Sequence, residues 1–322
     1  MIFRIFTLCL LFIEATTSHP VEVECFDLIV PVHVDAPIYP PIFPPLSNGY
    51  EATELVLQAT KRDANPNTTL LLGKPVNIST TFDIGVTYCS PHGYGNKSGI
   101  VQLLTHGIGF DRSYWNLDGE NNYKAAAAAL GYSVLFYDRL GVGLSSKPDP
   151  YTTIQVPVEL AILTSLTTLL RSGKISPKIP IPAKVVHVGH SYGSQLSNAL
   201  VASRPELSDG VILTAYSHNT TWQRWFQIAT AWHLASENQP ARFGNISSGF
   251  LTWGDKFSNQ YIFLKYPFFD PAVLASAEAG KQPFTVGELL TFPLAPVLAP
   301  RFAKPVMVRA ISLLRELHLK TC

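Results

Sequence analysis

The residues with the clearest chemical potential lie in the stretch VVHVGHSYGSQ, where Ser191 stands between Gly189 and Gly193. This GxSxG pattern is typical of a serine nucleophile at a sharp turn from a strand into a helix. Glycines are expected on both sides because the turn brings backbone segments close together. The helix that follows would direct its first N–H groups toward the same point and stabilise negative charge there. A plain strand-to-helix turn is the alternative interpretation.

A second glycine-containing turn, THGIG, follows the apolar run IVQLL. Gly107 and Gly109 would let this loop pass close to the serine and present a backbone N–H. The N–H groups of Ile108 and Tyr192 could then form a two-donor oxyanion hole, in which each donor is worth roughly 3 kcal/mol of transition-state stabilisation. His106 is expected to shape the loop rather than to act as the general base. A simple tight turn is the alternative here.

A nucleophilic serine needs a base, and the histidines that follow it in the sequence offer no obvious one. His218 ends the run VILTAYSH, His233 lies among aromatic residues, and His318 lies in the C-terminal run ISLLRELHL. Glu288 and Glu316 are expected to be solvated helix charges rather than catalytic acids. Without a base, the serine hydroxyl stays protonated and is a poor nucleophile at neutral pH.

The elements that must position these residues alternate between strands and helices. We expect strands at 100–104, 134–137, 185–188 and 211–215, and helices at 122–130, 156–171 and 194–203. Continuous apolar strands alternating with helices predict an α/β fold, with a mostly parallel sheet covered on both faces. Ligands bind at the carboxyl ends of strands in such sheets, which is where both glycine-containing turns lie.

The remaining segments divide the chain into regions. Residues 1–18 are expected to be a signal peptide, 19–75 an extended proline-rich arm, and 76–218 the core, which would open with a hairpin at 76–89. Residues 219–290 contain four tryptophans and helical pieces separated by Gly and Pro, and we expect an inserted helical cap over the site. An ordinary α-rich part of the core is the alternative. Residues 291–322 would return to the core and leave it incomplete.

Three motifs in order, HGIGFD, YDRLGVGLS and GHSYGS, resemble those of the α/β-hydrolase superfamily over roughly residues 76–308. The chain is similar to secreted fungal members with an esterase- or lipase-like domain of the AB hydrolase-1 type. The resemblance implies Ser191 as nucleophile, Tyr192 and Ile108 as oxyanion donors, and a site-shaping loop at 138–145. Epoxide hydrolases and dehalogenases of this superfamily carry an aspartate nucleophile, so a serine favours ester, thioester or amide chemistry.

The resemblance also implies the order nucleophile, acid, histidine, with the acid after a late strand, here 304–308. No aspartate follows Asp270. We therefore expect the last strand, a helix and the catalytic histidine to be missing, as in a truncated gene product. The alternatives are a non-catalytic hydrolase-like protein that binds an apolar ligand under its cap, and a fragment that does not fold.

The N-terminal residues predict export. Arg4 precedes an apolar run at 5–13, and small residues follow, with cleavage expected near Ser18. The alternative, a membrane anchor, is disfavoured because a spanning helix needs roughly 20 apolar residues. We expect a secreted protein with no stable membrane span.

Sequons and cysteines agree with an extracellular location. Five sequons begin at Asn67, Asn77, Asn96, Asn219 and Asn245. They predict a glycoprotein. In an oxidising compartment a Cys25–Cys89 disulfide is the preferred pairing, with Cys322 left over.

The composition indicates which kinds of binding partner are expected. The net charge of +1 and the lack of basic runs argue against nucleic acid, and 47% apolar residues allow a large core. No metal-binding cysteine or histidine cluster and no phosphate-binding glycine spacing is present, so we expect no metal and no cofactor. The expected partner is a small apolar acyl or ester substrate, while the oligomeric state is left open.

Overall fold

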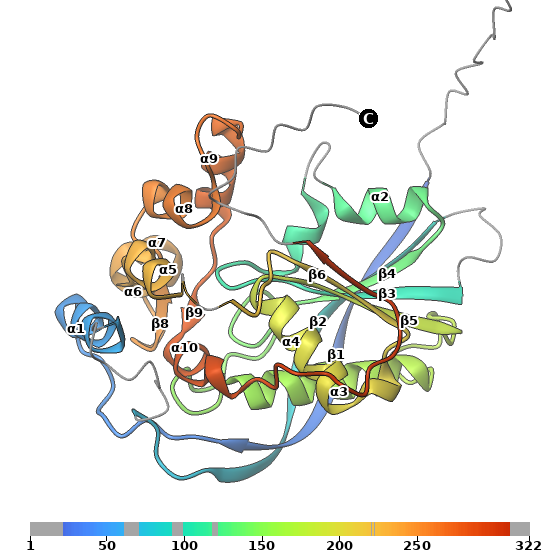
Figure 1. Cartoon of the computed structure of the whole chain (residues 1–322), viewed down its shortest axis with the longest axis horizontal. Helices are drawn as coiled ribbons and strands as arrows, with labels where there is room; N and C mark the ends of the chain where they lie inside the picture. The colour runs from blue at the N-terminus through green and yellow to red at the C-terminus, as the bar shows by residue number, and fades with distance from the viewer. Residues whose placement is uncertain are drawn as a thin grey trace, which may run out of the picture.

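The computed structural model describes residues 22–60, 71–91, 99–117, 122–219, 221 and 223–309. Within these residues, seven strands form a sheet in the order β1-β2-β4-β3-β5-β6-β10 (Figure 1). The strands are β1 (Val23–Ile38), β2 (Val76–Pro91), β3 (Ile100–Thr105), β4 (Ser133–Tyr137), β5 (Lys184–His190), β6 (Gly210–Thr214) and β10 (Val306–Arg309). β2 runs antiparallel to both β1 and β4, and the other pairs are parallel. The mostly parallel sheet expected from the sequence is confirmed.

Both faces of the central strands are covered. Leu103 and Leu135 belong to one hydrophobic cluster, whereas their chain neighbours Leu104 and Phe136 belong to a second. Because side chains alternate across a strand, the two clusters lie on opposite faces of the sheet. This explains why these strands read as continuous apolar runs.

The core helices agree with the periodic segments of the sequence. They are α2 (Tyr123–Ala129), α3 (Val156–Arg171) and α4 (Tyr192–Ser203). In Figure 1, α3 and α4 lie on one side of the sheet and α2 on the other. Short 3₁₀ turns occur at Arg112–Asn116, Pro205–Leu207 and Phe292–Leu294. α3 buries Ile162, Leu163 and Leu166 at the three- and four-residue spacing that its sequence shows.

The N-terminal part of the fold differs from the expectation. Residues 23–38, expected to lie as an extended arm over the surface, form β1, which pairs along its whole length with β2. The expected hairpin at 76–89 is wrong, because these residues belong to one strand rather than two. The proline-rich arm also contains a helix, α1 (Gly49–Thr60). The prolines did not prevent pairing, because β1 is an edge strand whose outer N–H groups need no partner.

The Cys25–Cys89 disulfide is confirmed. The two cysteines are directly opposite each other in the antiparallel ladder, with Cα atoms 4.2 Å apart. The disulfide therefore joins the edge strand to its neighbour near one end of the ladder. Cys322, the sequons at Asn67 and Asn96 and the signal peptide at 1–18 lie outside the described residues.

Between β6 and β10 the chain forms a separate layer of small elements, seen beside the sheet in Figure 1. They are α5 (Gln223–Thr230), β7 (His233–Leu234), α6 (Ala235–Asn238), α7 (Pro240–Phe243), β8 (Phe250–Thr252), α8 (Lys256–Phe263), α9 (Pro271–Gly280), β9 (Phe284–Thr285) and α10 (Val286–Thr291). β7, β8 and β9 form a three-stranded sheet that the helical interpretation of 219–290 did not include. α1 packs against α5 and β7, so the N-terminal segment reaches this layer.

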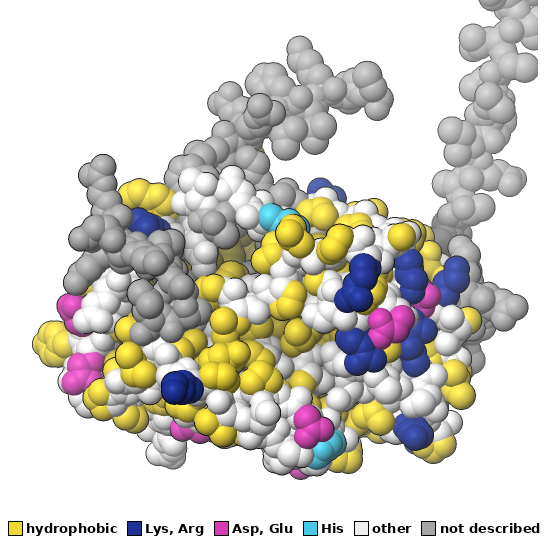
Figure 2. Space-filling model, turned by 60° about the horizontal axis from the view of Figure 1, so that its bottom comes forward, with side chains coloured by type: hydrophobic (Ala, Val, Ile, Leu, Met, Phe, Trp, Pro, Cys, Tyr) yellow, Lys and Arg dark blue, Asp and Glu magenta, His cyan; other side chains and the backbone are white. Residues whose placement is uncertain are grey.

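On the face shown in Figure 2, Lys and Arg side chains gather at one end with acidic side chains among them. Apolar side chains gather nearer the middle of the same face. Charges of both signs thus lie together at this end of the face. None of the helices in the described part of the chain has the length and apolar character needed to cross a bilayer.

Candidate active site

Ser191 lies between the end of β5 and the start of α4, where the sequence pattern places it. Its φ is 52° and its ψ is −115°, a conformation that residues with a Cβ rarely adopt. The backbone N–H of Ser191 donates to the carbonyl of Thr214 in β6, with an N–O distance of 2.9 Å. The turn is therefore held by a neighbouring strand, and the half-buried serine stands at the carboxyl edge of the parallel strands.

The two flanking glycines are required by close backbone contacts. A Cβ on Gly189 would lie 2.3 Å from the Cα of Ser194, in the first turn of α4. A Cβ on Gly193 would lie 2.0 Å from the carbonyl oxygen of Thr105, at the end of β3. Both distances are far below contact distance, so α4 can start this close to β3 and β5 only with glycine at both positions.

The loop after β3 passes beside the serine. A Cβ on Gly107 would lie 3.3 Å from the Cβ of Ser191. Gly109 has a φ of 75°, and its Cβ position is taken by the Trp253 ring, 2.1 Å away. The structure thus brings Gly107, Gly109 and Ser191 together, with Ile108 between the two glycines.

Tyr192 is the first residue of α4, so its backbone N–H has no partner within the helix. The helix dipole adds partial positive charge at the same place. The Tyr192 ring is buried, with the Arg139 guanidinium 4.6 Å from the ring centroid. The amide next to Ser191 is therefore available to a ligand, whereas the tyrosine side chain belongs to the interior.

Two histidines lie next to the turn, and neither is placed as a base for Ser191. His106 is fully buried, with its Nδ1 2.9 Å from the carbonyl of Gly107. The Nδ1 of His190 lies 3.1 Å from Oγ1 of Thr214, and its ring stacks on Tyr114. Burial lowers the pKa of His190 to about 4 and that of His106 well below its usual value, so both rings are neutral at physiological pH.

The histidines that follow Ser191 in the sequence do not hydrogen-bond to its hydroxyl in the described part of the chain. His218 is exposed after β6 and makes an edge-on contact with Tyr216. His233 is exposed on β7. Among the described residues, no histidine makes a hydrogen bond to the hydroxyl of Ser191. His318 and Glu316 lie outside the described residues.

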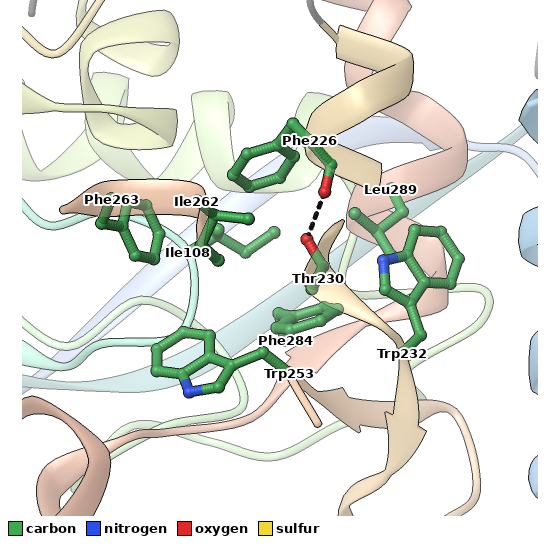
Figure 3. A pocket seen from close by; sticks show the side chains of 9 residues that line it. All are labelled: Ile108, Phe226, Thr230, Trp232, Trp253, Ile262, Phe263, Phe284 and Leu289. Carbon is green, nitrogen blue, oxygen red and sulfur yellow. Dashed lines mark hydrogen bonds between the residues drawn. The ribbon is translucent and has the colours of Figure 1, made fainter. Parts of the chain in front are cut away.

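A small apolar cavity lies between the Ile108 loop and the layer formed by α5–α10 (Figure 3). Its walls include Ile108 and five aromatic side chains: Phe226, Trp232, Trp253, Phe263 and Phe284. The space not filled by atoms is about 220 Å³ including open solvent, but only about 10 Å³ of it can hold the centre of a water molecule, so the side chains around it are almost in contact. The hydroxyl of Thr230, also on its wall, donates to the carbonyl of Phe226, whereas the buried indole Nε1 of Trp232 has no hydrogen-bond partner among the described residues. The segment expected to form a cap thus contacts the loop beside Ser191 and leaves an apolar space there.

Arg139, Glu159 and Glu288 form a buried ionic cluster near the turn that the sequence did not predict. Nη1 of Arg139 bonds both carboxylate oxygens of Glu159 at 2.8 Å and also contacts Glu288. The expectation that Glu288 is a solvated helix charge is wrong, because its side chain is 2% exposed and caps α10 through Thr285. Burial raises the pKa of Glu159 to about 8 despite the opposing charge of Arg139. One signal was available, since Glu159 lies among buried apolar residues of α3, where an unpaired carboxylate would be costly.

The match to a protein-family model agrees with this architecture. Residues 102–314 match the model of the alpha/beta hydrolase family. No curated protein is similar enough to the chain to match it. Solved structures with some similarity include the epoxide hydrolase VrEH1 from Vigna radiata (17% identity, TM-score 0.33, 43% of this chain and 36% of that chain covered). Others are potato (Solanum tuberosum) epoxide hydrolase I (19%, 0.32, 44% and 39%) and Est1E from Butyrivibrio proteoclasticus with bound ferulic acid (14%, 0.32, 42% and 49%).

The similarity spans less than half of each of these solved structures. The family match is broader, because it covers more than half of the chain and includes the Ser191 turn, the Ile108 loop and the layer between β6 and β10. The chain belongs to the alpha/beta hydrolase family.

Proposed function

We propose that this chain is a serine hydrolase that acts on ester or related acyl bonds through Ser191. The observation that carries the proposal is the strained backbone of Ser191, with a φ of 52°, between a parallel strand and a helix N-terminus. Such a turn exposes the serine hydroxyl at the top of the sheet, where an acyl carbon could approach it. The family itself supports hydrolase chemistry.

In this proposal the Oγ of Ser191 attacks the acyl carbon, its proton passes to water, and the carbonyl oxygen becomes an oxyanion. The N–H groups of Tyr192 and Ile108 receive that oxyanion. The oxyanion then re-forms the carbonyl with loss of the protonated alcohol, and water hydrolyses the acyl-enzyme to release the acid and restore the serine. The apolar side chains beside Ile108 would contact the acyl or aryl group of a small ester after moving apart, because the space between them now holds about one water molecule. The described residues supply no histidine base for the serine, so the attack would be slow if no residue outside them provides one.

The test uses a fluorophosphonate probe on the full-length protein. We expect one probe molecule to attach covalently to each chain, and peptide mass spectrometry to place it on Ser191. A Ser191→Ala variant serves as the control and should not be labelled. Labelling elsewhere, or no labelling after prolonged incubation at high probe concentration, would contradict the proposal.

A second candidate function is supported by one observation: no described histidine bonds to the Ser191 hydroxyl. A non-catalytic member of the family could bind a small apolar ligand between the same side chains after they move apart. Trp232 and Trp253 line the cavity, so binding should change tryptophan fluorescence. Saturable quenching by a small aryl ester, without labelling of Ser191 or hydrolysis of the ester, would favour this alternative.

We further propose that the protein is secreted and glycosylated. The proposal rests on the leader-like residues 1–18 together with the Cys25–Cys89 disulfide, which is typical of oxidising compartments. Asn77, Asn219 and Asn245 are exposed and available to a glycosyltransferase.

Expression in a eukaryotic secretory host should give protein in the medium that begins near residue 19. An N-glycosidase should lower its mass, and each change of Asn77, Asn219 or Asn245 to Gln should remove one glycan. Protein that stays inside the cell with an intact leader and no change in mass would contradict this proposal.

A further inference from the structure

The Gly107–Ile108 peptide is held from its carbonyl side by two buried side chains. The carbonyl oxygen of Gly107 lies 2.9 Å from Nδ1 of His106 and 3.3 Å from Nη2 of Arg139. His106 and Arg139 are 0% and 2% exposed, so water does not compete for this carbonyl on that side. The two contacts therefore fix the direction of the Gly107 C=O bond.

The direction of these hydrogen bonds follows from a neighbouring contact. The backbone N–H of Arg139 can only donate, and it lies 3.0 Å from Nε2 of His106. Nε2 must therefore carry the lone pair, which leaves the proton on Nδ1, and Nδ1–H donates to Gly107. Burial and the Arg139 charge lower the pKa of His106 well below its usual value, so this neutral form persists over a wide pH range.

Arg139 is itself held in place. Its Nη1 bonds Glu159 from α3 and Glu288 from α10, and its guanidinium lies over the Tyr192 ring. These contacts come from elements far apart in the sequence, so Arg139 has little freedom to move. Its Nη2 then points to the Gly107 carbonyl as a fixed donor.

A peptide unit is planar, and its N–H points opposite to its C=O. When His106 and Arg139 hold the Gly107 carbonyl on one side, the N–H of Ile108 must point to the other. Gly107 lies against Ser191, with the 3.3 Å approach described above. We propose that His106 and Arg139 are positioning residues that lock the Gly107–Ile108 peptide with the Ile108 N–H directed toward the oxyanion at Ser191. This inference rests on the proposed function, because it assigns a purpose to the orientation of that N–H.

The lock predicts a specific kinetic change. In His106→Leu the nearer of the two donors to the Gly107 carbonyl is lost, and the peptide is held only by the longer contact with Nη2 of Arg139, so its orientation is less fixed. The maximal rate constant of fluorophosphonate labelling should fall about 10- to 100-fold, because an oxyanion donor contributes on the order of 10²–10³ in rate. The probe concentration that gives half the maximal rate should not change, since the cavity walls are unaltered.

The matched control is His187→Leu. His187 is also fully buried, and both of its ring nitrogens are bonded, to Thr167 and Ser208, but it does not contact the Gly107 loop. Both variants should lose comparable folding stability, whereas only His106→Leu should lose labelling rate. An equal loss of rate in the two variants would mean that His106 acts through stability alone and would overturn the inference.

Two further variants test the donor itself. In His106→Asn the side-chain amide can place an N–H close to the former position of Nδ1, so it should recover part of the lost rate. Arg139→Lys keeps a cation between the two glutamates but cannot also reach Gly107, and it should lower the rate less than His106→Leu does. Failure of the asparagine variant to exceed the leucine variant would contradict the donor role.

A crystal structure of His106→Leu separates this inference from the proposed function. If the wild-type protein is not labelled at all, the proposed function fails, and the orientation of the peptide still decides the inference. A turned Gly107–Ile108 peptide supports the lock. A peptide unchanged from the wild type overturns it, whatever the labelling rates are.

Discussion

Replacing Gly193 with alanine is expected to lower the free energy of unfolding by about 4 kcal/mol or more and to abolish labelling of Ser191. The added Cβ would lie 2.0 Å from the carbonyl oxygen of Thr105 and 2.7 Å from that of His106. Both are backbone atoms of the central strand and its loop, so no side chain can turn away to make room. Overpacking typically costs 1–3 kcal/mol, and a clash with fixed backbone belongs at or above the upper end. The first turn of α4 must move away, and Ser191 moves with it.

Gly280→Ala is the matched control for this substitution. Gly280 ends α9, and its Cβ position is open, with no atom within 4 Å. Its stability should stay the same or rise slightly, because alanine is the better helix former. Denaturant unfolding and fluorophosphonate labelling measure the two effects. A Gly193→Ala protein with wild-type stability and labelling would show that α4 does not approach β3 this closely.

Stability should fall steeply on the acid side of pH 6.5. Burial lowers the pKa values of three histidines, to about 3 for His187, about 4 for His190 and well below the usual value for His106. Below pH 6.5 these histidines are protonated in the unfolded chain and remain neutral in the folded protein. The free energy of unfolding therefore rises with pH in this range. Each such proton is worth more than about 1 kcal/mol per pH unit, and together the three should outweigh any opposing group.

The alkaline side should show a shallower fall. Burial raises the pKa of Glu159 from 4.5 to about 8. Between these values the folded protein keeps a proton that the unfolded chain has released, so this contribution is lost as pH rises toward 8. The three histidines no longer oppose it above pH 6.5, and stability should therefore be maximal near that pH.

Urea unfolding between pH 5 and pH 9 tests both sides of this profile. Glu159→Gln should flatten the alkaline side, because glutamine does not titrate. Glu54→Gln, which changes an exposed carboxylate on α1, should leave the profile unchanged. An alkaline side that survives in Glu159→Gln would assign it to another group, and constant stability from pH 5 to 6.5 would contradict the state inferred for the histidines.

The positions of the central strands and of the Ser191 turn were predictable from the sequence. Each of these strands is buried on both faces, so its residues form a continuous apolar run. The glycines at 189 and 193 are required by close contacts at their own positions, which makes them visible as a local pattern. Since parallel strands end at one edge of the sheet, the loop at Gly107 could also be placed near the serine before any coordinates were available.

Other features depend on long-range contacts that leave little trace in the sequence. β1 contains prolines and exposed residues, and its strand conformation comes from pairing with β2, about 50 residues later. The three short strands between β6 and β10 have two or three residues each, too few to show alternation. Arg139 contacts Glu288, which lies 149 residues later in the sequence. The residues around each of them give no indication of this contact.

The contact between Glu288 and Arg139 limits how the layer between β6 and β10 could be exchanged for that of a relative. A graft that replaced this layer together with α10 would remove Glu288. Of the two glutamates that contact the Arg139 guanidinium, Glu159 alone would remain. The guanidinium would lose one of the two side chains that hold it in position. Chimeras should therefore be designed with the junction before Glu288, so that the exchange leaves the contacts of Arg139 intact.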